Sequence, residues 1–147
     1  ISECLVGFGD VYKRQYQKDV IVAEVSMGFT MEDYADREKL SPEQRKGMAT
    51  KPNLAEAVEY PMTPEGQAAF MQKVMERIAQ VPDGRGKGFY YWEPAWIPVP
   101  GCGWANEESL KYIQDPGPGG NEWANQALFD YDGNALPALK VIRDFQK

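Results

Sequence analysis

The chain has 147 residues, of which 43% are hydrophobic and 26% charged, a composition that excludes an intrinsically disordered protein. The formal net charge of −6, without any long lysine or arginine run, argues against a nucleic-acid-binding surface. No apolar run approaches the roughly 20 residues that a membrane-spanning helix needs. Histidine is absent, which excludes Ser-His-Asp and Cys-His catalysis and His-ligated zinc, and the two cysteines, Cys4 and Cys102, cannot build a disulfide framework. Any chemistry must therefore rest on carboxylates, tyrosines, lysines or an oxygen-ligated metal.

The first 15 residues do not match the rest of the chain. Residues 1–15 (ISECLVGFGDVYKRQ) lack the basic start and the apolar run of about 7–15 residues that define a signal peptide. The string CLVGFGDVYKRQ instead resembles translated sequencing-adaptor read-through. We therefore expect a non-native leader over 1–15 and one folded domain over 16–147. A native N-terminal loop and strand is the alternative interpretation.

A strand and a long loop follow this leader. The run DVIVAEV at 19–25 is apolar and rich in β-branched residues, which is typical of a buried strand in a parallel sheet. A charged, irregular stretch then extends over 27–60. Within it, the sequence predicts a short helix in 31–39 and a second helix start at 41–44.

The clearest helix signal begins at Thr63. Thr63 is a capping hydroxyl, Pro64 suits the first helical turn, and Glu65 lies near the positive end of the helix. The sequence Pro-Asp-Gly at 82–84 ends the helix. Its apolar face, spaced i, i+3, i+4 and i+7, consists of Met71, Val74, Met75 and Ile78.

The second half of the chain repeats this order. The run KGFYYW at 87–92 predicts a second buried strand, and a loop rich in proline and glycine follows it. A short element is predicted at 127–131 and a turn at 132–134, after which Pro137 opens a last helix. One side of that helix carries Leu139, Ile142 and Phe145.

The element order predicts an α/β fold built from two β–loop–α units. Such units place their strands parallel with right-handed crossovers. The long loops follow the C-terminal ends of the strands, which is where catalytic residues gather in an α/β barrel. Two strands cannot close a barrel, and a (β/α)8 barrel needs about 250 residues. We therefore expect part of such a barrel.

Two groups of residues at the strand ends are candidates for chemistry. Glu24 ends an otherwise apolar strand, where a carboxylate is costly unless it is paired, hydrogen-bonded or used. Trp92, Glu93 and Trp96 follow the second strand, and indole rings suit stacking on the C–H faces of sugars. A structural salt bridge for Glu24 and core packing for the tryptophans are the alternatives. Because both groups fall on one edge of a parallel sheet, we expect a single site.

Two further patterns are weaker. Oxygen ligands in the long loops suit a hard cation such as calcium, although no EF-hand spacing is present and a solvated acidic loop is the alternative. These residues are Asp33, Asp36, Asp115 and Asn121. The sequence GRGKG at 84–88 is no phosphate loop, because it lacks the GxxxxGK[ST] pattern and precedes a strand instead of a helix.

Four segments carry a resemblance to a known family. They are VAEVS (22–26), YPMTPEGQAAF (60–70), VPDGRGKGFYYWEPAWIPVPG (81–101) and NEWANQALFDYDGNALPAL (121–139). Together they resemble glycoside hydrolase family 53, the arabinogalactan endo-β-1,4-galactanases. The resemblance runs from about Lys18 to the end of the chain. It implies the C-terminal portion of the family's (β/α)8 barrel, namely its last two β/α units.

The resemblance also implies roles for individual residues. Glu24 corresponds to the nucleophile that ends strand seven of the family's barrel, and Trp92 to a sugar platform that ends strand eight. The family's general acid/base is the glutamate of an Asn-Glu pair at the end of strand four. Both Asn-Glu pairs of this chain, at 106–107 and 121–122, follow the second strand. We therefore expect this chain to lack the acid/base and to be inactive alone.

The reaction and its setting follow from the same resemblance. A retaining glycosidase holds two carboxyls about 5–5.5 Å apart, one attacking the anomeric carbon and the other protonating the leaving oxygen. We expect a secreted enzyme, monomeric when complete, that cleaves the β-1,4-galactan of plant cell walls and requires no cofactor. A structural calcium ion between the loops after strands seven and eight is implied for bacterial members. The alternatives are another retaining glycosidase of the same barrel clan and a non-catalytic carbohydrate-binding module, usually a β-sandwich.

Overall fold

The structure, a computed structural model, describes residues 16–32, 55–97, 107–112 and 124–146. In chain order its elements are β1 (Val20–Val25), α4 (Pro64–Ala79), η1 (Pro82–Gly84), β2 (Gly86–Tyr91), α5 (Glu107–Tyr112), η2 (Ala124–Gln126) and α6 (Pro137–Asp144). Both strands, the long helix and the last helix agree with the sequence-based expectations to within a few residues. The leader at 1–15, the helix start at 41–44 and nearly all of the helix expected in 31–39 lie outside the described residues.

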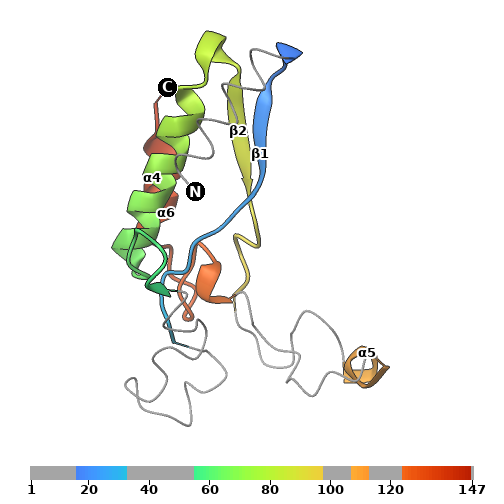
Figure 1. The fold of residues 1–147 in the computed structure, drawn as a ribbon. Helices are drawn as coiled ribbons and strands as arrows, with labels where there is room; N and C mark the ends of the chain where they lie inside the picture. Colours follow the sequence, from blue (N-terminus) through green and yellow to red (C-terminus); the bar gives the residue numbers. More distant parts are fainter. Residues whose placement is uncertain (1–15, 33–54, 98–106, 113–123, 147) are drawn as a thin grey trace.

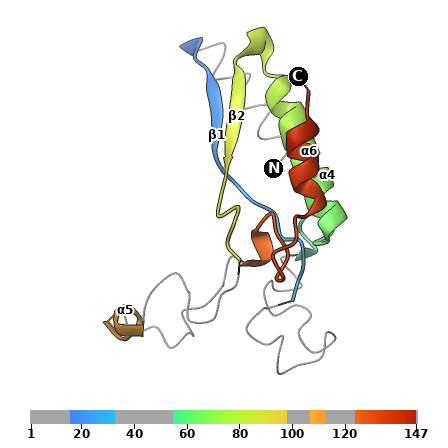
Figure 2. The ribbon, with the colours of Figure 1, turned by 180° about the vertical axis from the view of Figure 1, so that it is seen from behind.

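The described elements form two layers. β1 and β2 pair in parallel, as the β–loop–α order predicts. α4 and α6 lie side by side and cover one face of this strand pair (Figures 1 and 2). α5 lies apart from the strands and from both of these helices in the two views. Parallel strands covered by helices exclude the β-sandwich of the binding-module alternative for the described part of the chain.

α4 begins where the sequence predicts it. The Thr63 hydroxyl accepts a hydrogen bond from the Gly66 amide at 3.0 Å, and Pro64 occupies the first turn. The cap satisfies one of the amides that a helix start leaves without an intrahelical partner. At the other end, η1 follows at 82–84 and leads directly into β2.

The core lies between α4, α6 and the strand pair. Its largest fully buried apolar side chain, Met71 on α4, has no exposed surface, and burying such a side chain contributes about 1.5–3 kcal/mol. All four residues of the predicted apolar face of α4 are buried. Met71 packs with Ala68, Leu128 and Ala138, and the strand residues against this cluster are Val25, Phe89 and Tyr91.

Helix α4 and strand β2 approach each other closely at Gly86. A Cβ atom placed on Gly86 would lie 1.8 Å from the carbonyl oxygen of Ile78, so only glycine fits there. This close approach occurs just after η1, where the chain turns from the end of α4 back into the sheet.

The segment that precedes α6 forms a turn, as expected. The Asp130 carboxylate accepts hydrogen bonds from the amides of Asp132 and Asn134, at 2.9 and 2.8 Å. In place of the short element expected at 127–131, the structure has η2 at 124–126 and an isolated antiparallel bridge between Phe129 and Ala135.

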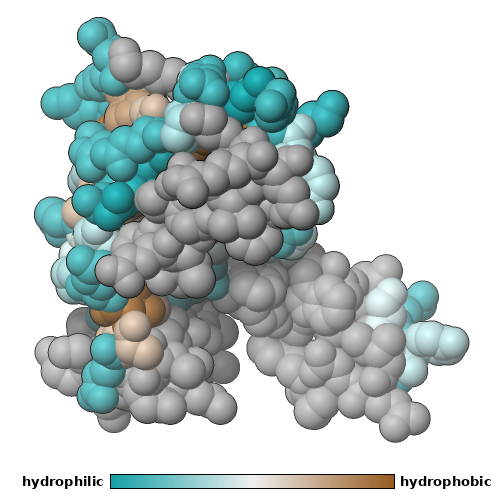
Figure 3. Space-filling view, turned by 45° about the horizontal axis from the view of Figure 1, so that its top comes forward, coloured by the Kyte–Doolittle hydropathy of each residue, from teal (hydrophilic) through white to brown (hydrophobic). Residues whose placement is uncertain are grey.

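The strands differ from their expected burial. The sequence predicts strands covered on both faces, but Ile21 is 51% exposed and Tyr90 67% exposed. The physical reason is that, within the described part of the chain, helices cover only one face of the strand pair. In the space-filling view of Figure 3, hydrophilic residues dominate the described surface and hydrophobic areas are small.

Candidate active site

The two strands end at the same edge of the sheet. β1 and β2 run in parallel, so their C-terminal ends point in one direction, toward η2 (Figure 1). The Trp92 amide donates a hydrogen bond to the Val25 carbonyl at 2.9 Å and extends the pairing one residue past β2. Trp92 therefore lies beside the end of β1, next to the residue that follows Glu24. The expectation that Glu24 and Trp92 meet at one edge of the sheet agrees with this geometry.

β1 carries a register shift beside Glu24. Val22 pairs with Phe89 and Val25 with Tyr91, so β1 carries one more residue than β2 between these two pairs. Phe89, Tyr91 and Val25 all pack against the helix-side core. Ala23 and Glu24 are both exposed. Because side chains alternate along a strand, Glu24, which directly precedes Val25, lies on the face that the helices do not cover. Bulges of this kind often re-aim a side chain beside a functional site.

Glu24 is exposed in this chain. The expectation of a buried carboxylate that is costly unless it is used is therefore wrong for this chain. Its exposure and its place at the strand end leave its carboxylate accessible to a ligand that approaches the open face of the sheet.

Trp92 shares the open face with Glu24. Its neighbour Tyr91 points to the helix side, and side chains alternate along a strand, so Trp92 points to the opposite side. It is 42% exposed, unusually open for an indole. Tyr90 is also exposed, and adds an aromatic ring to the part of the strand that precedes Trp92.

Glu93 and Trp96 form the turn after β2. Glu93 has φ = 52°, a left-handed conformation that non-glycine residues adopt only at some cost. The Trp96 amide donates to the Glu93 carbonyl at 3.4 Å, and both side chains are half-buried. The Pro94 carbonyl accepts from the Leu128 amide at 2.8 Å, which ties this turn to the segment after η2.

A buried polar cluster lies behind the strand ends, on the helix side. Gln67, in the first turn of α4, has no exposed surface. Its Nε2 donates to the carbonyls of Met27 and Ala127, at 2.8 and 2.9 Å, and lies 3.3 Å from the Tyr91 hydroxyl. The Tyr91 hydroxyl donates to the Gln126 carbonyl at 2.7 Å. We call this group of contacts the Gln67–Tyr91 cluster.

Burial determines the protonation of the cluster's hydroxyl. Desolvation raises the pKa of Tyr91 to about 12, although hydrogen bonds with the Met27 backbone and with Gln67 act in the opposite direction. Tyr91 is therefore a neutral donor at any pH at which a protein of this type works. Gln67 is not among the functional residues predicted from the sequence. The signal was its position four residues before Met71, which places a polar side chain on the apolar face of α4.

More backbone contacts join the loop after β1 to the region around η2. The Phe29 amide donates to the Asn125 carbonyl at 2.8 Å, and the Asn125 side-chain amide donates to the Thr30 carbonyl at 3.1 Å. The Ser26 hydroxyl donates to the Gln126 side chain. The loops that leave the two strands are thus held together at the edge that carries Glu24 and Trp92.

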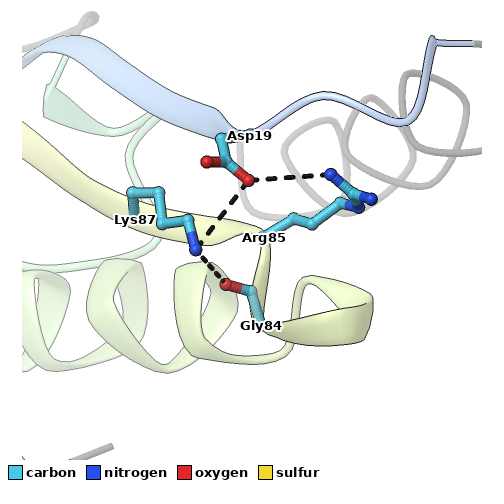
Figure 4. A network of polar contacts seen from close by, with 4 residues as sticks. All are labelled: Asp19, Gly84, Arg85 and Lys87. Atoms are coloured by element: carbon cyan, nitrogen blue, oxygen red, sulfur yellow. Dashed lines mark hydrogen bonds and ion pairs between the residues drawn. The ribbon is translucent and has the colours of Figure 1, made fainter.

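The opposite end of the strand pair has a different character. There Asp19 forms ion pairs with Arg85 and Lys87 at 3.7 and 3.8 Å, and Lys87 also donates to the Gly84 carbonyl at 2.9 Å (Figure 4). Both cations of the GRGKG sequence therefore join the strand starts, which agrees with rejecting it as a phosphate loop. These side chains are partly exposed, so each pair contributes at most about 1 kcal/mol.

The proposed metal ligands cannot be placed. Asp33, Asp36, Asp115 and Asn121 lie outside the described residues. Within the residues that the structure does describe, no group of three or more carboxylates or cysteines could hold a metal ion. None of the described helices is long and apolar enough to cross a membrane.

Solved structures resemble this arrangement. The GH53 catalytic domain of Ignisphaera aggregans superposes with a TM-score of 0.74 at 30% identity, covering 97% of this chain and 34% of that chain. A structure from a study of two fungal β-1,4-galactanases gives a TM-score of 0.55 over 99% of this chain and 33% of that one. At 21% identity, this second likeness shows the fold alone. The described β/α elements thus match about a third of a GH53 barrel domain.

Curated relatives give the family. The endo-beta-1,4-galactanase of Bacillus subtilis (strain 168) is 36% identical over 146 residues, which cover 87% of this chain and 32% of the relative. The arabinogalactan endo-beta-1,4-galactanase of Thermothelomyces thermophilus is 32% identical over 83 residues, 56% of this chain and 19% of the relative. The chain thus spans about a third or less of the length of these relatives. The family model described as Glycosyl hydrolase family 53 matches residues 8–142, and this chain therefore belongs to glycosyl hydrolase family 53.

Proposed function

We propose that this chain supplies the nucleophile and part of the sugar-binding surface of a secreted, retaining endo-β-1,4-galactanase. One observation carries the proposal: Glu24 and Trp92 end neighbouring parallel strands on the same uncovered face, in a chain of family 53. The name of the Bacillus subtilis relative supports β-1,4-galactan as the substrate. A polysaccharide of this size is degraded outside the cell, which supports secretion.

In this proposal the two strands are the last two of a (β/α)8 barrel. The face that α4 and α6 leave open would be the inner face of that barrel, because barrel helices pack outside the strands. The exposed Ile21 and Tyr90 support this assignment, since both would be covered when the remaining strands are in place.

The chemistry needs two carboxyls, and Glu24 supplies one. Its ionised carboxylate attacks the anomeric carbon and forms a glycosyl–enzyme intermediate, while a second carboxyl protonates the leaving oxygen and later activates water. We propose that the second carboxyl comes from elsewhere in the complete barrel, since this chain spans about a third of its relatives. No cofactor has a role in this reaction.

Trp92 would hold the sugar next to the bond that is cleaved. Its indole lies one strand away from Glu24 on the same face, and a flat aromatic surface packs well against the C–H face of galactose. Glu93 and Trp96, in the turn that follows, would contribute polar and apolar contacts to the same sugar-binding region.

The test replaces the nucleophile in the complete catalytic domain. Glu24→Gln should lower kcat on galactan by at least roughly 10⁴-fold, as expected when a nucleophile is removed. The matched control is Glu76→Gln, on α4 near the other end of the strands, where the amide can still bond to Gln72. Azide should restore turnover to the Glu24→Gly variant, because it can attack the anomeric carbon in place of the missing carboxylate. The expected product is a glycosyl azide of inverted configuration. A Gln variant with near-normal galactan hydrolysis would contradict the assignment.

Two further measurements identify the preferred substrate and test whether the isolated chain has activity. Hydrolysis should be fast on galactan and slow on cellulose, mannan and xylan, and proton NMR should show a product that keeps the β configuration. The 147-residue chain alone should not hydrolyse galactan, because it lacks the second carboxyl. Preferred cleavage of another polysaccharide would favour a different retaining glycosidase of the same clan.

A further inference from the structure

We propose that Gln67 and Tyr91 are positioning residues that fix the end of β1, and with it Glu24, relative to Trp92. The proposal rests on the proposed function, because it assigns a role to residues that support that site without touching the substrate. It concerns the Gln67–Tyr91 cluster behind the two strand ends.

One side chain, that of Gln67, connects three segments of the chain. The Gln67 amide belongs to α4, the Met27 carbonyl to the chain that leaves β1, and the Ala127 carbonyl to the segment after η2. Each of these carbonyls is held within 3 Å of the same nitrogen. Met27 follows Glu24 by three residues, so a movement of its carbonyl moves the end of the strand that carries Glu24.

Tyr91 contacts two of the same segments from the end of β2. Its hydroxyl bonds to the Gln126 carbonyl at 2.7 Å and lies 3.4 Å from the Met27 carbonyl. Its backbone precedes Trp92 directly. Tyr91 therefore anchors, from the helix side, both the strand that carries Trp92 and the loop that follows Glu24.

The Gln67 amide uses its donors but not its acceptor within the described part of the chain. Three acceptors surround its nitrogen: two carbonyls and the Tyr91 hydroxyl. Its Oε1 is buried and accepts no hydrogen bond from any described residue. A buried polar atom without a partner is costly, so the two donors of the amide must outweigh that cost. An apolar side chain of similar length would fill the same space without that cost, but it could not hold two carbonyls together.

The cluster is separate from the substrate side. Gln67 is fully buried under the helices, whereas Glu24 and Trp92 are exposed on the opposite face of the strands. Its influence on the reaction would be exerted through the backbone. A displacement of a reacting group by about 1 Å can lower a rate on the order of 100-fold.

The test compares two methionine substitutions on one helix in the complete catalytic domain. Gln67→Met keeps the length of the side chain and removes both donors. Gln72→Met is the matched control, because Gln72 lies on the same helix and its side-chain amide donates to Glu76, also on α4. Tyr91→Phe keeps the ring and removes only the hydroxyl. If Gln67→Met does not fold, the kinetics of Tyr91→Phe alone test the positioning role.

The readouts separate positioning from stability. Well below the melting temperature, Gln67→Met should lower kcat on galactan roughly 10- to 100-fold and change KM less than about threefold. Tyr91→Phe should lower kcat about fivefold. The double variant should be no slower than about half the rate of Gln67→Met, because both side chains act on the Met27 carbonyl. The rate at which an activated 2-deoxy-2-fluoro galactoside traps Glu24 should fall by the same factors as kcat.

The outcomes are distinguishable from a failure of the proposed function. Variants of Gln67 and Tyr91 that melt earlier, yet keep normal kcat and trapping rates per folded enzyme, would show a purely structural cluster and overturn the inference. In that case an inactive Glu24→Gln would leave the proposed function intact. An active Glu24→Gln would overturn the proposed function itself.

Discussion

The exposed indole of Trp92 allows a worked prediction for the variant Trp92→Ala. Trp92 is 42% exposed, which is about 100 Å² of a side chain that presents up to roughly 250 Å². At ~25 cal/mol per Å², covering all of this area would contribute ~2.5 kcal/mol. A sugar covers one ring face, about half of the area, so stacking contributes ~1.3 kcal/mol, a factor of roughly ten in affinity.

The assay is steady-state hydrolysis of galacto-oligosaccharides by the complete domain. Loss of stacking alone should raise KM about tenfold, and a sugar misplaced beside Glu24 should also lower kcat, by up to about 100-fold. Trp92→Phe keeps a smaller aromatic face and should lose roughly threefold in kcat/KM. Tyr16→Ala serves as the control, because Tyr16 is 52% exposed near the start of β1, away from Glu24. Normal kinetics for Trp92→Ala in a fully folded enzyme would refute the stacking role.

Two changes test the packing that holds the site. Gly86→Ala should lower the free energy of unfolding by about 3 kcal/mol or more, because the new methyl group would lie 1.8 Å from the Ile78 carbonyl oxygen. An unchanged denaturation midpoint would contradict this close approach. Thr63→Ala should lower it by about 1 kcal/mol through loss of the cap on the Gly66 amide, whereas Thr63→Ser should be nearly neutral in the same denaturant titration.

Local signals in the sequence were sufficient to predict the main helices and strands. The cap at Thr63, the proline after it and the periodic apolar face specify α4 without reference to the rest of the chain, and the structure confirms that helix. The same holds for α6, which Pro137 opens. The placement of Glu24 and Trp92 at one edge follows from parallel strand order, which the two β–loop–α units determine.

The support behind the site depends on long-range contacts. Gln67 reaches carbonyls 40 and 60 residues away in the chain, and no local pattern specifies such partners. The exposure of Ile21 was also not predicted. An apolar strand sequence does not show which face of the strand the rest of the chain covers. The role of Glu24 came from the family resemblance, since a carboxylate at a strand end is common and the structure leaves it exposed.

The extra residue in β1 has a consequence for comparing family members. Because Val25 packs against the core, the residue directly before it faces the uncovered side of the sheet whether or not Ala23 is present. Deleting Ala23 would restore an even register with β2, place Glu24 opposite the exposed Tyr90 and leave it on the same face. A homologue can therefore lack the extra residue and keep the arrangement, provided that its glutamate directly precedes the residue that pairs with the position of Tyr91. An alignment of this strand is best anchored on the spacing between the glutamate and position 25.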